Sequence, residues 1–535
     1  MTKRLLIRNL RLPLDSKEEE FSGLFERQLS LPAGTILSLR LVRQSIDARK
    51  KNAVCFSVHI EAEMEEKAAL RLIGAGLAEE ALREEGTELV HGNERQRGRI
   101  VVAGLGPCGL FAARLLAAEG YRPLVIERGK PVSERVSDVE RYWRSGELNP
   151  HSNVAFGEGG AGTFSDGKLT TRIKDRRIDR VLRGLIDCGA PKEIAYLARP
   201  HIGTDRLRSV VFNLRRQIEE LGGEVRFSSR LCDVQISDGK LTHIVIEAGG
   251  EKERIECCAL LLAIGQGARD TYEMLYDRGL WMQAKPFAAG VRVEHPQILI
   301  NRAQYGEFFD RPRLGAASYA LTGKSGDRGV YTFCMCPGGR VIASASGEEQ
   351  VVTNGMSDYA RDGKNANAAI VVQVRPEDCG ASPLDGLRFL NRLERSAYQL
   401  GGGGGTAPAS TVEAYLAGRR CKRFLEVSPT YLPGVRGEHL ETCLPDFINA
   451  GIREGIRQFS RQLRGFDMPE AVLTAVESRT SAPLRIVRGE DMESPSAHGI
   501  YPLGEGAGYA GGIVSAAVDG LKGAEAVIAR FSEKP

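Results

Sequence analysis

The sequence lacks the features of several protein classes. Its eleven cysteines are an odd number with no C-x-x-C spacing, so they indicate neither a disulfide framework nor a zinc ribbon, and we expect a cytoplasmic protein. The eight histidines form no H-x-H or H-x-x-x-H pair, so we predict no metal site. The longest apolar run, Ala259–Ile264, is too short to cross a bilayer, and the charged start is a poor signal peptide. We therefore predict no membrane association.

A strong charge imbalance is also missing, since 73 basic and 69 acidic residues leave a net charge of +4. Such a balance gives no overall attraction to nucleic acid or anionic lipid. With 42% hydrophobic and 27% charged residues, general disorder is excluded, and 535 residues predict about three domains. What the chain has in excess is glycine, 62 residues without a Gly-X-Y period, which excludes collagen.

Residues 1–98 predict a small α/β domain of ferredoxin-like type that ends in a polar linker, His91–Arg99. Its predicted elements are strands Leu5–Ile7, Ile36–Val42 and Ala53–Ile60 and helices Lys17–Leu29 and Glu63–Glu85. Leu5–Leu10 faintly resembles the first strand of an RNA-recognition module, but the stacking aromatics are missing. Nucleic-acid binding is thus only an alternative, and Arg43, Arg49, Lys50 and Lys51 predict either an anion patch or docking on the larger domain.

A dinucleotide fingerprint follows the linker. Strand Ile100–Ala103 runs into a G-x-G-x-x-G turn, a helix and a second strand that ends at Glu127. Gly104 allows the tight turn, Gly106 lets the backbone approach a pyrophosphate, and Gly109 permits close packing of helix on strand. The helix N-terminus then favours phosphate, and Glu127 stands where a carboxylate accepts the ribose hydroxyls. The alternative is an ordinary glycine-rich turn.

The fingerprint alone does not choose between NAD and FAD, and two later segments favour FAD. One is the apolar strand Ala259–Ile264, which ends at Gly265. The other is the glycine-rich stretch Gly504–Ile513, which precedes a helix over Val514–Phe531 whose N-terminus can stabilise negative charge on a reduced flavin.

Nearly the whole chain resembles a bacterial family of mostly uncharacterised FAD-dependent dehydrogenases in the NAD(P)/FAD oxidoreductase superfamily, which has a glutathione-reductase-type FAD fold. The resemblance rests on motifs at Ser45–Lys51, Gly157–Lys168, Phe333–Gly339, Asn354–Ser357, Glu477–Pro483 and Gly504–Ile513. It implies non-covalently bound FAD and an acidic ligand for the ribityl hydroxyls, here Glu505 where the wider superfamily has aspartate. It assigns FAD contacts to Gly104, Gly106, Pro107, Gly109, Glu127, Arg128, Leu231, Gly265, Glu505, Gly506, Gly511, Gly512 and Ile513.

The loop Gly157–Lys168 holds five glycines in twelve residues. Backbone N–H groups of such a loop can approach the pyrophosphate and the flavin edge, so Gly160, Gly162, Thr163 and Ser165 are further predicted contacts. Lys168 is a catalytic candidate. The alternative is a mobile surface loop.

Two further motifs carry candidate chemistry. Arg479 in Glu477–Ser481 predicts a group that orients an anionic substrate or stabilises developing negative charge, with Ser481 as a second catalytic candidate. The alternative there is a structural ion pair of Glu477 with Arg479 or another partner. Cys334 and Cys336 lie two apart on a predicted strand, a separation awkward for a disulfide, and we interpret them as buried apolar cysteines.

The predicted fold class is α/β, with a Rossmann-like FAD-binding domain interrupted by an antiparallel, β-rich substrate domain. Its predicted boundaries are 1–98 for the N-terminal domain, 99–283 and 425–535 for the FAD-binding domain, and 284–424 for the substrate domain. We expect an FAD-dependent oxidoreductase acting on a small molecule, with NAD(P)H entering the substrate cleft if it is the electron donor, because no second fingerprint follows a strand. The alternatives are a flavoprotein that binds RNA through its first domain and a protein in which FAD is structural. The substrate and the oligomeric state do not follow from the sequence.

Overall fold

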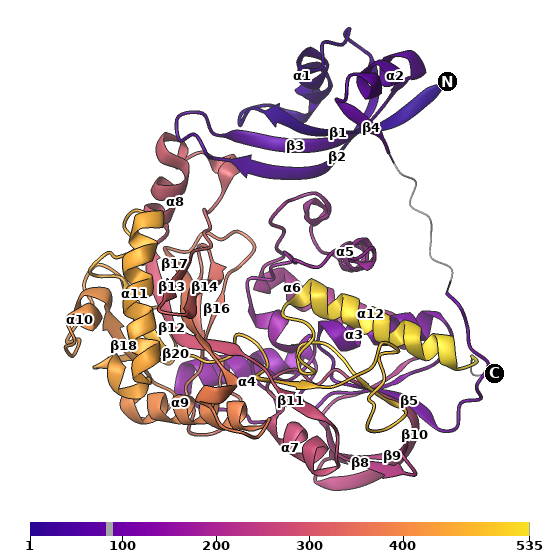
Figure 1. Ribbon diagram of the computed structural model, residues 1–535, viewed down its shortest axis with the longest axis vertical. Helices are drawn as coiled ribbons and strands as arrows, with labels where there is room; N and C mark the ends of the chain where they lie inside the picture. The colour runs from indigo at the N-terminus through magenta and orange to yellow at the C-terminus, as the bar shows by residue number, and fades with distance from the viewer. Residues whose placement is uncertain (82–88, 534–535) are drawn as a thin grey trace.

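The computed structural model describes residues 1–81 and 89–533 (Figure 1). Its strands form two seven-stranded sheets, one four-stranded sheet and two pairs, so the predicted mixed α/β class is confirmed. In Figure 1 the four-stranded N-terminal unit lies at the top, the first seven-stranded sheet at the lower right and the second at the left. Within the described residues, no helix is both long and apolar enough to span a membrane.

The N-terminal unit is an antiparallel sheet with two helices. Side chains of its third strand alternate, with Phe56, Val58 and Ile60 buried, which is the period-two pattern of a strand that covers a core on one face. The strands pair in the order β2-β3-β1-β4, and the elements follow one another as βαββαβ. The elements are β1 (Thr2–Leu12), α1 (Phe21–Gln28), β2 (Ile36–Asp47), β3 (Cys55–Glu65), α2 (Glu66–Gly74) and β4 (Ala78–Glu80).

The predicted helix Glu63–Glu85 is wrong over most of its length. Glu63–Glu65 continue β3 because Ala62 and Met64 keep its inward alternation, and α2 ends where Gly76 adopts a φ of +68°. Ala78–Glu80 form β4, and residues 82–85 of the predicted helix lie outside the described residues. The spacing of apolar residues predicts a longer helix, but a glycine in the left-handed conformation ends a helix even where that spacing continues.

The N-terminal unit contacts the larger body at several places, among them Leu14 and Ser16, whose carbonyls accept from Arg313. Gln44 exchanges backbone hydrogen bonds with Tyr196 and Ala198, at 2.7 and 2.8 Å. The ammonium of Lys51 donates to the carbonyl of Gln304. Of the two alternatives for this basic segment, these contacts favour docking.

Hydrogen bonds fix the predicted linker, His91–Arg99, against the C-terminal helix. Gly92 N donates to Ile528 O at 2.8 Å, and Arg530 Nε donates to Glu94 Oε2 at 2.8 Å. Residues 92–94 therefore follow the end of the C-terminal helix.

The first seven-stranded sheet has the order β7-β6-β5-β10-β9-β8, with β22 paired to β10. Strands β5, β6, β7, the end of β10 and β22 are parallel, whereas β8 and β9 form an antiparallel extension. Ile100–Ala103 are all buried, as expected for a parallel strand covered on both faces. The strands are β5 (Arg99–Ala103), β6 (Leu124–Ile126), β7 (Glu224–Arg226), β8 (Ser229–Ser237), β9 (Lys240–Ala248), β10 (Glu251–Leu262) and β22 (Ile500–Pro502).

Helices cover this sheet, and α3 lies against α12 in Figure 1. Both are apolar on most sides because each is enclosed by other elements. A turn in which Ser228 has a φ of +51° separates β7 from β8. The helices are α3 (Pro107–Ala118), α4 (Val132–Ser145), α5 (Arg177–Asp187), α6 (Thr204–Glu220), α7 (Arg269–Asp277) and α12 (Ile513–Arg530).

The second seven-stranded sheet has the order β13-β14-β17-β12-β20-β18-β19 and is antiparallel except for the pair β18-β19. Helix α11 lies along it (Figure 1). Its strands are β12 (Phe287–Pro296), β13 (Thr322–Ser325), β14 (Arg328–Cys336), β17 (Asn365–Val374), β18 (Ala407–Thr411), β19 (Val435–Gly437) and β20 (Val472–Glu477). Two strand pairs flank it, β11 (Met282–Ala284) with β21 (Leu484–Ile486) and β15 (Arg340–Ala343) with β16 (Thr353–Met356). The remaining helices are α8 (Gln297–Tyr305), α9 (Asp385–Gly401), α10 (Val412–Leu416) and α11 (Asp446–Gln462).

The chain stays with this second sheet beyond the predicted boundary at residue 425. Strands β19 and β20 pair within it, and α11 packs on it; β22 is the later strand that joins the first sheet. The apolar run Val472–Val476 predicts a strand but not its sheet, because pairing partners are distant in sequence.

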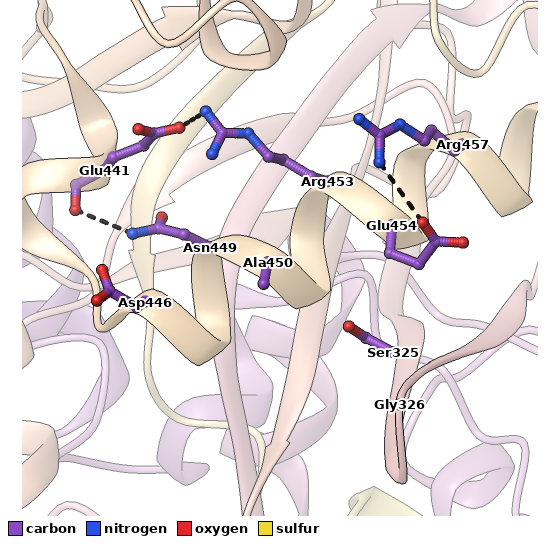
Figure 2. Close-up of a pocket in the computed structure, with 9 residues that line it drawn as sticks. All are labelled: Ser325, Gly326, Glu441, Asp446, Asn449, Ala450, Arg453, Glu454 and Arg457. Carbon is purple, nitrogen blue, oxygen red and sulfur yellow. Dashed lines mark hydrogen bonds and ion pairs between the residues drawn. The ribbon is translucent and has the colours of Figure 1, made fainter.

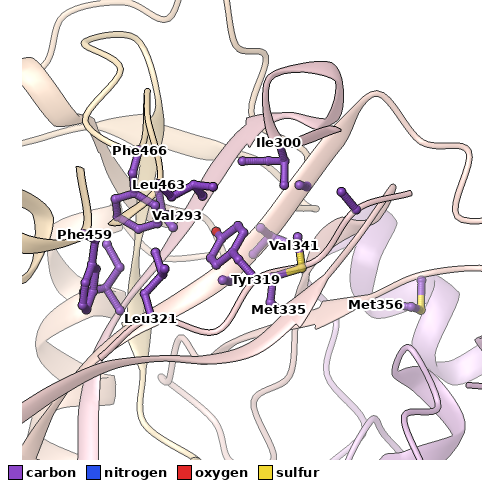
Figure 3. Close-up of a cluster of buried hydrophobic side chains, with 14 of the residues drawn as sticks. Val293, Ile300, Tyr319, Leu321, Met335, Val341, Met356, Phe459, Leu463 and Phe466 are labelled. Carbon is purple, nitrogen blue, oxygen red and sulfur yellow. The ribbon is translucent and has the colours of Figure 1, made fainter. Parts of the chain in front are cut away.

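Aromatic rings fill the core between α11 and the second sheet (Figure 3). Phe466 is fully buried and contacts Phe459 and Tyr319 edge to face, with ring centroids 5.4 and 5.7 Å apart. Such contacts add to the gain from burying the rings. Phe466 thereby joins the end of α11 to the sheet.

We predict that Phe466→Ala lowers the free energy of unfolding by about 3–5 kcal/mol, because truncation of a buried phenylalanine leaves a cavity. Leu425→Ala is the control, since Leu425 is 59% exposed and should change stability by less than about 0.5 kcal/mol. Denaturant titration followed by tryptophan fluorescence measures both. Equal midpoints for the two variants would contradict this role of Phe466.

Candidate functional site

A cavity of about 440 Å³ lies where the first sheet, the glycine-rich loops and the second sheet meet. At one end it is lined by the turn between β5 and α3, and at the other by residues of β14 and the segment after β20. Its volume is in the range of small-molecule sites. The predicted site residues that line it are Gly104, Gly106, Pro107, Glu127, Arg128, Gly160, Gly162, Ser165, Lys168, Leu231, Gly265, Arg479, Glu505, Gly511, Gly512 and Ile513.

The fingerprint turn leaves no room for side chains. Gly104 has a φ of +103°, and a Cβ there would lie 2.3 Å from Ala263 O. A Cβ at Gly109 would lie 1.9 Å from Gly104 O, so Gly109 allows α3 to approach the turn and does not itself line the cavity. Gly106 precedes Pro107, the first residue of α3, and the helix N-terminus opens into the cavity.

Glu127 holds the backbone around this end of the cavity. Its carboxylate accepts three backbone N–H groups, from Leu105 at 2.8 Å and from Gly129 and Gly157 at 2.9 Å each. The neighbouring Arg128 donates to Asp270 Oδ1 at 2.8 Å and lies over the ring of Phe156. Glu127, which the sequence predicts to accept the ribose hydroxyls, therefore also holds three backbone segments in place.

The glycine-rich loop is clamped by Arg135, a residue that the sequence analysis did not single out. Arg135 is fully buried and donates to four carbonyls, those of Asn153, Val154, Glu158 and Gly160. Burial lowers the pKa of its guanidinium to about 10 despite nearby carboxylates, so it stays charged at neutral pH. These bonds argue against a mobile surface loop.

Besides Gly109, three predicted site residues lie outside the cavity lining as the described residues define it. Thr163 is buried, and its hydroxyl donates to Glu158 O at 3.2 Å. A Cβ at Gly506 would lie 2.6 Å from Gly265 O, so this glycine allows two loops to touch. Ser481 is half-buried beyond Thr480, the last lining residue of that segment. In this geometry none of the three has direct access to a ligand in the cavity.

Glu505 lines the cavity beside the first turn of α12. Its Oε1 accepts from Gln266 Nε2 at 2.7 Å. Burial raises the pKa of this carboxyl to about 7, against the opposing charge of Lys285. Gln266, which the sequence analysis missed, also donates to Arg479 O at 3.1 Å and so connects the two motifs.

Arg479 and Lys168 line the end of the cavity near the second sheet. Within the described part of the chain, neither Nη1 nor Nη2 of Arg479 has a hydrogen-bond partner, and its Nε lies 3.7 Å from Glu394 Oε1. The alternative of a Glu477–Arg479 pair does not hold, because Glu477 pairs with Arg292 at 2.9 and 3.0 Å.

Lys168 Nζ lies 3.4 Å from Asp166 Oδ2 and 3.5 Å from Cys336 Sγ. Burial disfavours the charge of Lys168, but Asp166 and the two thiols outweigh this effect and raise its pKa. The group is therefore an ammonium ion and not a proton acceptor at neutral pH.

Cys336 is buried, as interpreted, but Cys334 is only partly buried, and the strand is bulged where the two cysteines lie. Cys334 has a φ of +45°, and the register of β14 against β17 shifts between Phe333 and Cys336. Cys334 lines the cavity, and Cys336 contacts the Lys168 ammonium. A bulge of this kind has no signal in the sequence beyond Pro337 and the glycines after it.

A second cavity lies at α11, far in sequence from the dinucleotide motifs (Figure 2). It is lined by charged side chains that pair with one another, Arg453 with Glu441 and Arg457 with Glu454. None of the predicted site residues lines it.

Comparison with known proteins places the chain in a family. Residues 286–480 match the family model for the FAD-dependent protein, C-terminal domain-like, and residues 4–63 match a domain of unknown function, DUF8436. An uncharacterised protein of Clostridium beijerinckii is 48% identical over 530 residues, which is 98% of each chain. The chain belongs to this family of FAD-dependent proteins. The predicted cofactor, FAD, is confirmed.

Solved structures show weaker likeness to this FAD-dependent protein. CtdE in complex with FAD is 15% identical, with a TM-score of 0.31 over 80% of this chain and 83% of that one. A geranylgeranyl bacteriochlorophyll reductase-like protein from Thermoplasma acidophilum is 12% identical, with a TM-score of 0.35 over 81% and 78%. At such scores these structures carry no weight for function.

The cavity of the FAD-dependent protein fits the cofactor. Gly511 has open space where a Cβ would stand, and Gly104 and Gly106 bring backbone to the cavity wall. Helices α3 and α12 both begin there. Two helix N-termini suit the anionic parts of a dinucleotide, and Glu505 suits hydroxyl donors.

We predict that FAD binding weakens as pH falls through about 7. Hydroxyl donors stabilise the ionised form of Glu505, so binding lowers its pKa and releases a proton, and below pH 7 the affinity should fall by up to about tenfold per pH unit. Quenching of FAD fluorescence between about pH 6 and pH 8 measures the dissociation constant.

Glu505→Gln should weaken binding at the upper pH and remove this dependence. The exposed Glu251 supplies the control, Glu251→Gln. An unchanged pH slope in Glu505→Gln would assign the dependence to another group.

Proposed function

We propose that this flavoprotein is an oxidoreductase that passes a hydride between flavin N5 and a small organic substrate bearing an anionic group. The observation that carries the proposal concerns Arg479, which lines the cavity where it reaches the second sheet. Among the described residues, neither of its terminal guanidinium nitrogens has a hydrogen-bond partner. The flavin supplies the hydride chemistry when bound, and the chain supplies position and electrostatics.

Charge balance around Arg479 supports an anionic ligand. Glu394 is fully buried and accepts from Arg269 Nη2 and Ser478 Oγ, each at 2.7 Å. Burial raises the pKa of Glu394, but Arg269 and Arg479 outweigh it and hold the pKa below its ordinary value. Two cations thus share one carboxylate, which leaves an excess of positive charge at Arg479, beside the cavity.

An arginine in a dry site binds a carboxylate through two parallel N–H donors, which fixes the orientation of a substrate as well as its affinity. The alternative of a developing negative charge would place the same guanidinium next to the reacting atoms. The two roles predict different behaviour towards an uncharged analogue of the substrate. If Arg479 binds the anionic group, the analogue binds more weakly; if Arg479 stabilises charge at the reacting atoms, the analogue binds as well as the substrate.

A nicotinamide donor would use the same cavity, since the sequence has no second fingerprint after a strand. This remains a proposal, as does the cytoplasmic location. RNA binding gains no support from the N-terminal unit, because Gln44 and Lys51 contact the rest of the protein.

An anaerobic screen tests the function. The oxidised holoenzyme is mixed with small hydroxy and amino acids, their methyl esters, and NADH or NADPH, and loss of flavin absorbance is followed. We expect at least one acid to bleach the flavin faster than its ester. If no compound bleaches the flavin, the proposal of hydride transfer with small molecules is wrong. Equal rates for acid and ester would exclude only the requirement for an anionic group on the substrate.

We predict that Arg479→Met lowers kcat/KM for the acid by about tenfold to a hundredfold and leaves the ester unchanged, because a charged hydrogen bond contributes about 1.5–3 kcal/mol. Arg269 still pairs with Glu394 in this variant, so no buried charge is stranded. Arg340→Met, at a half-exposed arginine of the strand pair, is the matched control. Equal losses for acid and ester would indicate a role in cofactor position instead.

A further inference from the structure

The strand that borders the cavity is distorted at Cys334. In a regular strand successive side chains point to opposite faces, yet Phe333 and Cys334 both line the cavity. The φ of +45° at Cys334 and the register shift account for this arrangement. A left-handed non-glycine residue is strained, and such strain is found mostly where function requires it.

The distortion brings the thiol of Cys336 to the backbone of Cys334. Residues two apart in a regular strand have Cα atoms roughly 6.6 Å apart, close to the upper limit of about 6.8 Å for a disulfide, and a bulge shortens that separation. Cys336 Sγ donates to Cys334 O at 3.3 Å, so the Cys336 thiol lies against the backbone of Cys334. A Cβ at Gly355 would lie 2.8 Å from Cys336 Sγ, so the glycine leaves space for this sulfur.

The surroundings of the pair favour a thiolate. The bond from Cys336 and the charges of Lys168 and Arg292 outweigh burial and Asp166, and hold the pKa of Cys334 well below its usual range. Lys168 is in turn fixed by Asp166, which pairs with Arg361 at 2.5 and 2.9 Å. Arg292 donates to Cys334 O at 3.3 Å.

We propose that Cys334 and Cys336 are a redox-active dithiol that exchanges two electrons with the FAD of the same chain. In the oxidising direction the Cys334 thiolate and the Cys336 thiol form one S–S bond as the Cys336 S–H bond breaks; the pair loses two electrons and one proton, and FAD takes these up with one further proton from solvent to become FADH2. In the other direction FADH2 returns them and the S–S bond breaks.

The two sulfurs have different roles. Cys336 is fully buried, whereas Cys334 is partly exposed in the cavity. Cys334 is therefore the sulfur that a small thiol or disulfide reaches, and Cys336 is the one that closes the bond. The proposal rests on FAD as cofactor and not on the anionic substrate.

Electron counting tests the proposal without a substrate. Air-oxidised holoprotein is titrated with dithionite under anaerobic conditions, with flavin absorbance and total electron uptake recorded. Wild type should take up four electrons per FAD, whereas Cys334→Ser and Cys336→Ser should take up two. Cys443→Ser, at an equally buried cysteine outside the cavity, should behave as wild type. Uptake of two electrons by wild type would overturn the proposal.

A second measurement needs no variant and covers the case in which the serine proteins do not fold. Oxidised and reduced wild-type protein are denatured, alkylated and analysed by peptide mass. Cys334 and Cys336 should be blocked in the oxidised sample and alkylated in the reduced one, and alkylation of both in each sample would overturn the proposal. Neither result bears on hydride transfer from an anionic substrate, which the screen of metabolites tests separately.

Discussion

The cofactor end of the molecule depends on one buried carboxylate. Glu127 accepts backbone N–H groups from the fingerprint turn, from the residue after Arg128 and from the start of the glycine-rich loop. Three segments must converge on one side chain, and they leave no room for Cβ atoms: one at Gly129 would lie 2.5 Å from Gly157 N. Arg135 satisfies the carbonyls of the same loop. The glycine surplus at this end is therefore a consequence of ligating backbone to Glu127 as well as of approaching a dinucleotide.

What the sequence could predict was local. The turn at Gly104, the helix behind it and the stretch around Gly511 each carry their constraint within a few residues, and the structure lines one cavity with them. Arg135 and Glu394 could not be found in this way, because a buried charge has no sequence signature until its partners are known, and Glu394 lies 84 positions from Ser478 and farther from Arg269. The bulge at Cys334 depends on β17, so a strand pattern alone predicted regular alternation.

The sequence also does not show which of the two seven-stranded sheets a strand joins, because its pairing partners are distant in the sequence. The family match ends at residue 480, just after β20, and β20 pairs with β12 and β18 in the second sheet. The chain leaves this sheet through Arg479 and Thr480, which line the cavity, and then reaches β21 and β22. The sequence predicts that the chain returns to the FAD-binding domain at residue 425, which is too early. The hydrophobic patterns of α11 and β20 are compatible with either sheet. Packing against the second sheet decides their place, and it places Arg479 at the junction.

The two cations near the second sheet differ in how far their charge is compensated. Lys168 has its own carboxylate, Asp166, and a thiol within 3.5 Å. Arg479 shares Glu394 with Arg269, and its two terminal nitrogens have no partner among the described residues. A free anion entering the cavity gains more from the uncompensated charge, because the interaction of Lys168 with it is opposed by Asp166. Lys168 instead contacts Cys336 Sγ on β14, at 3.5 Å. Substrate and thiol chemistry can therefore occupy one cavity without competing for one cation.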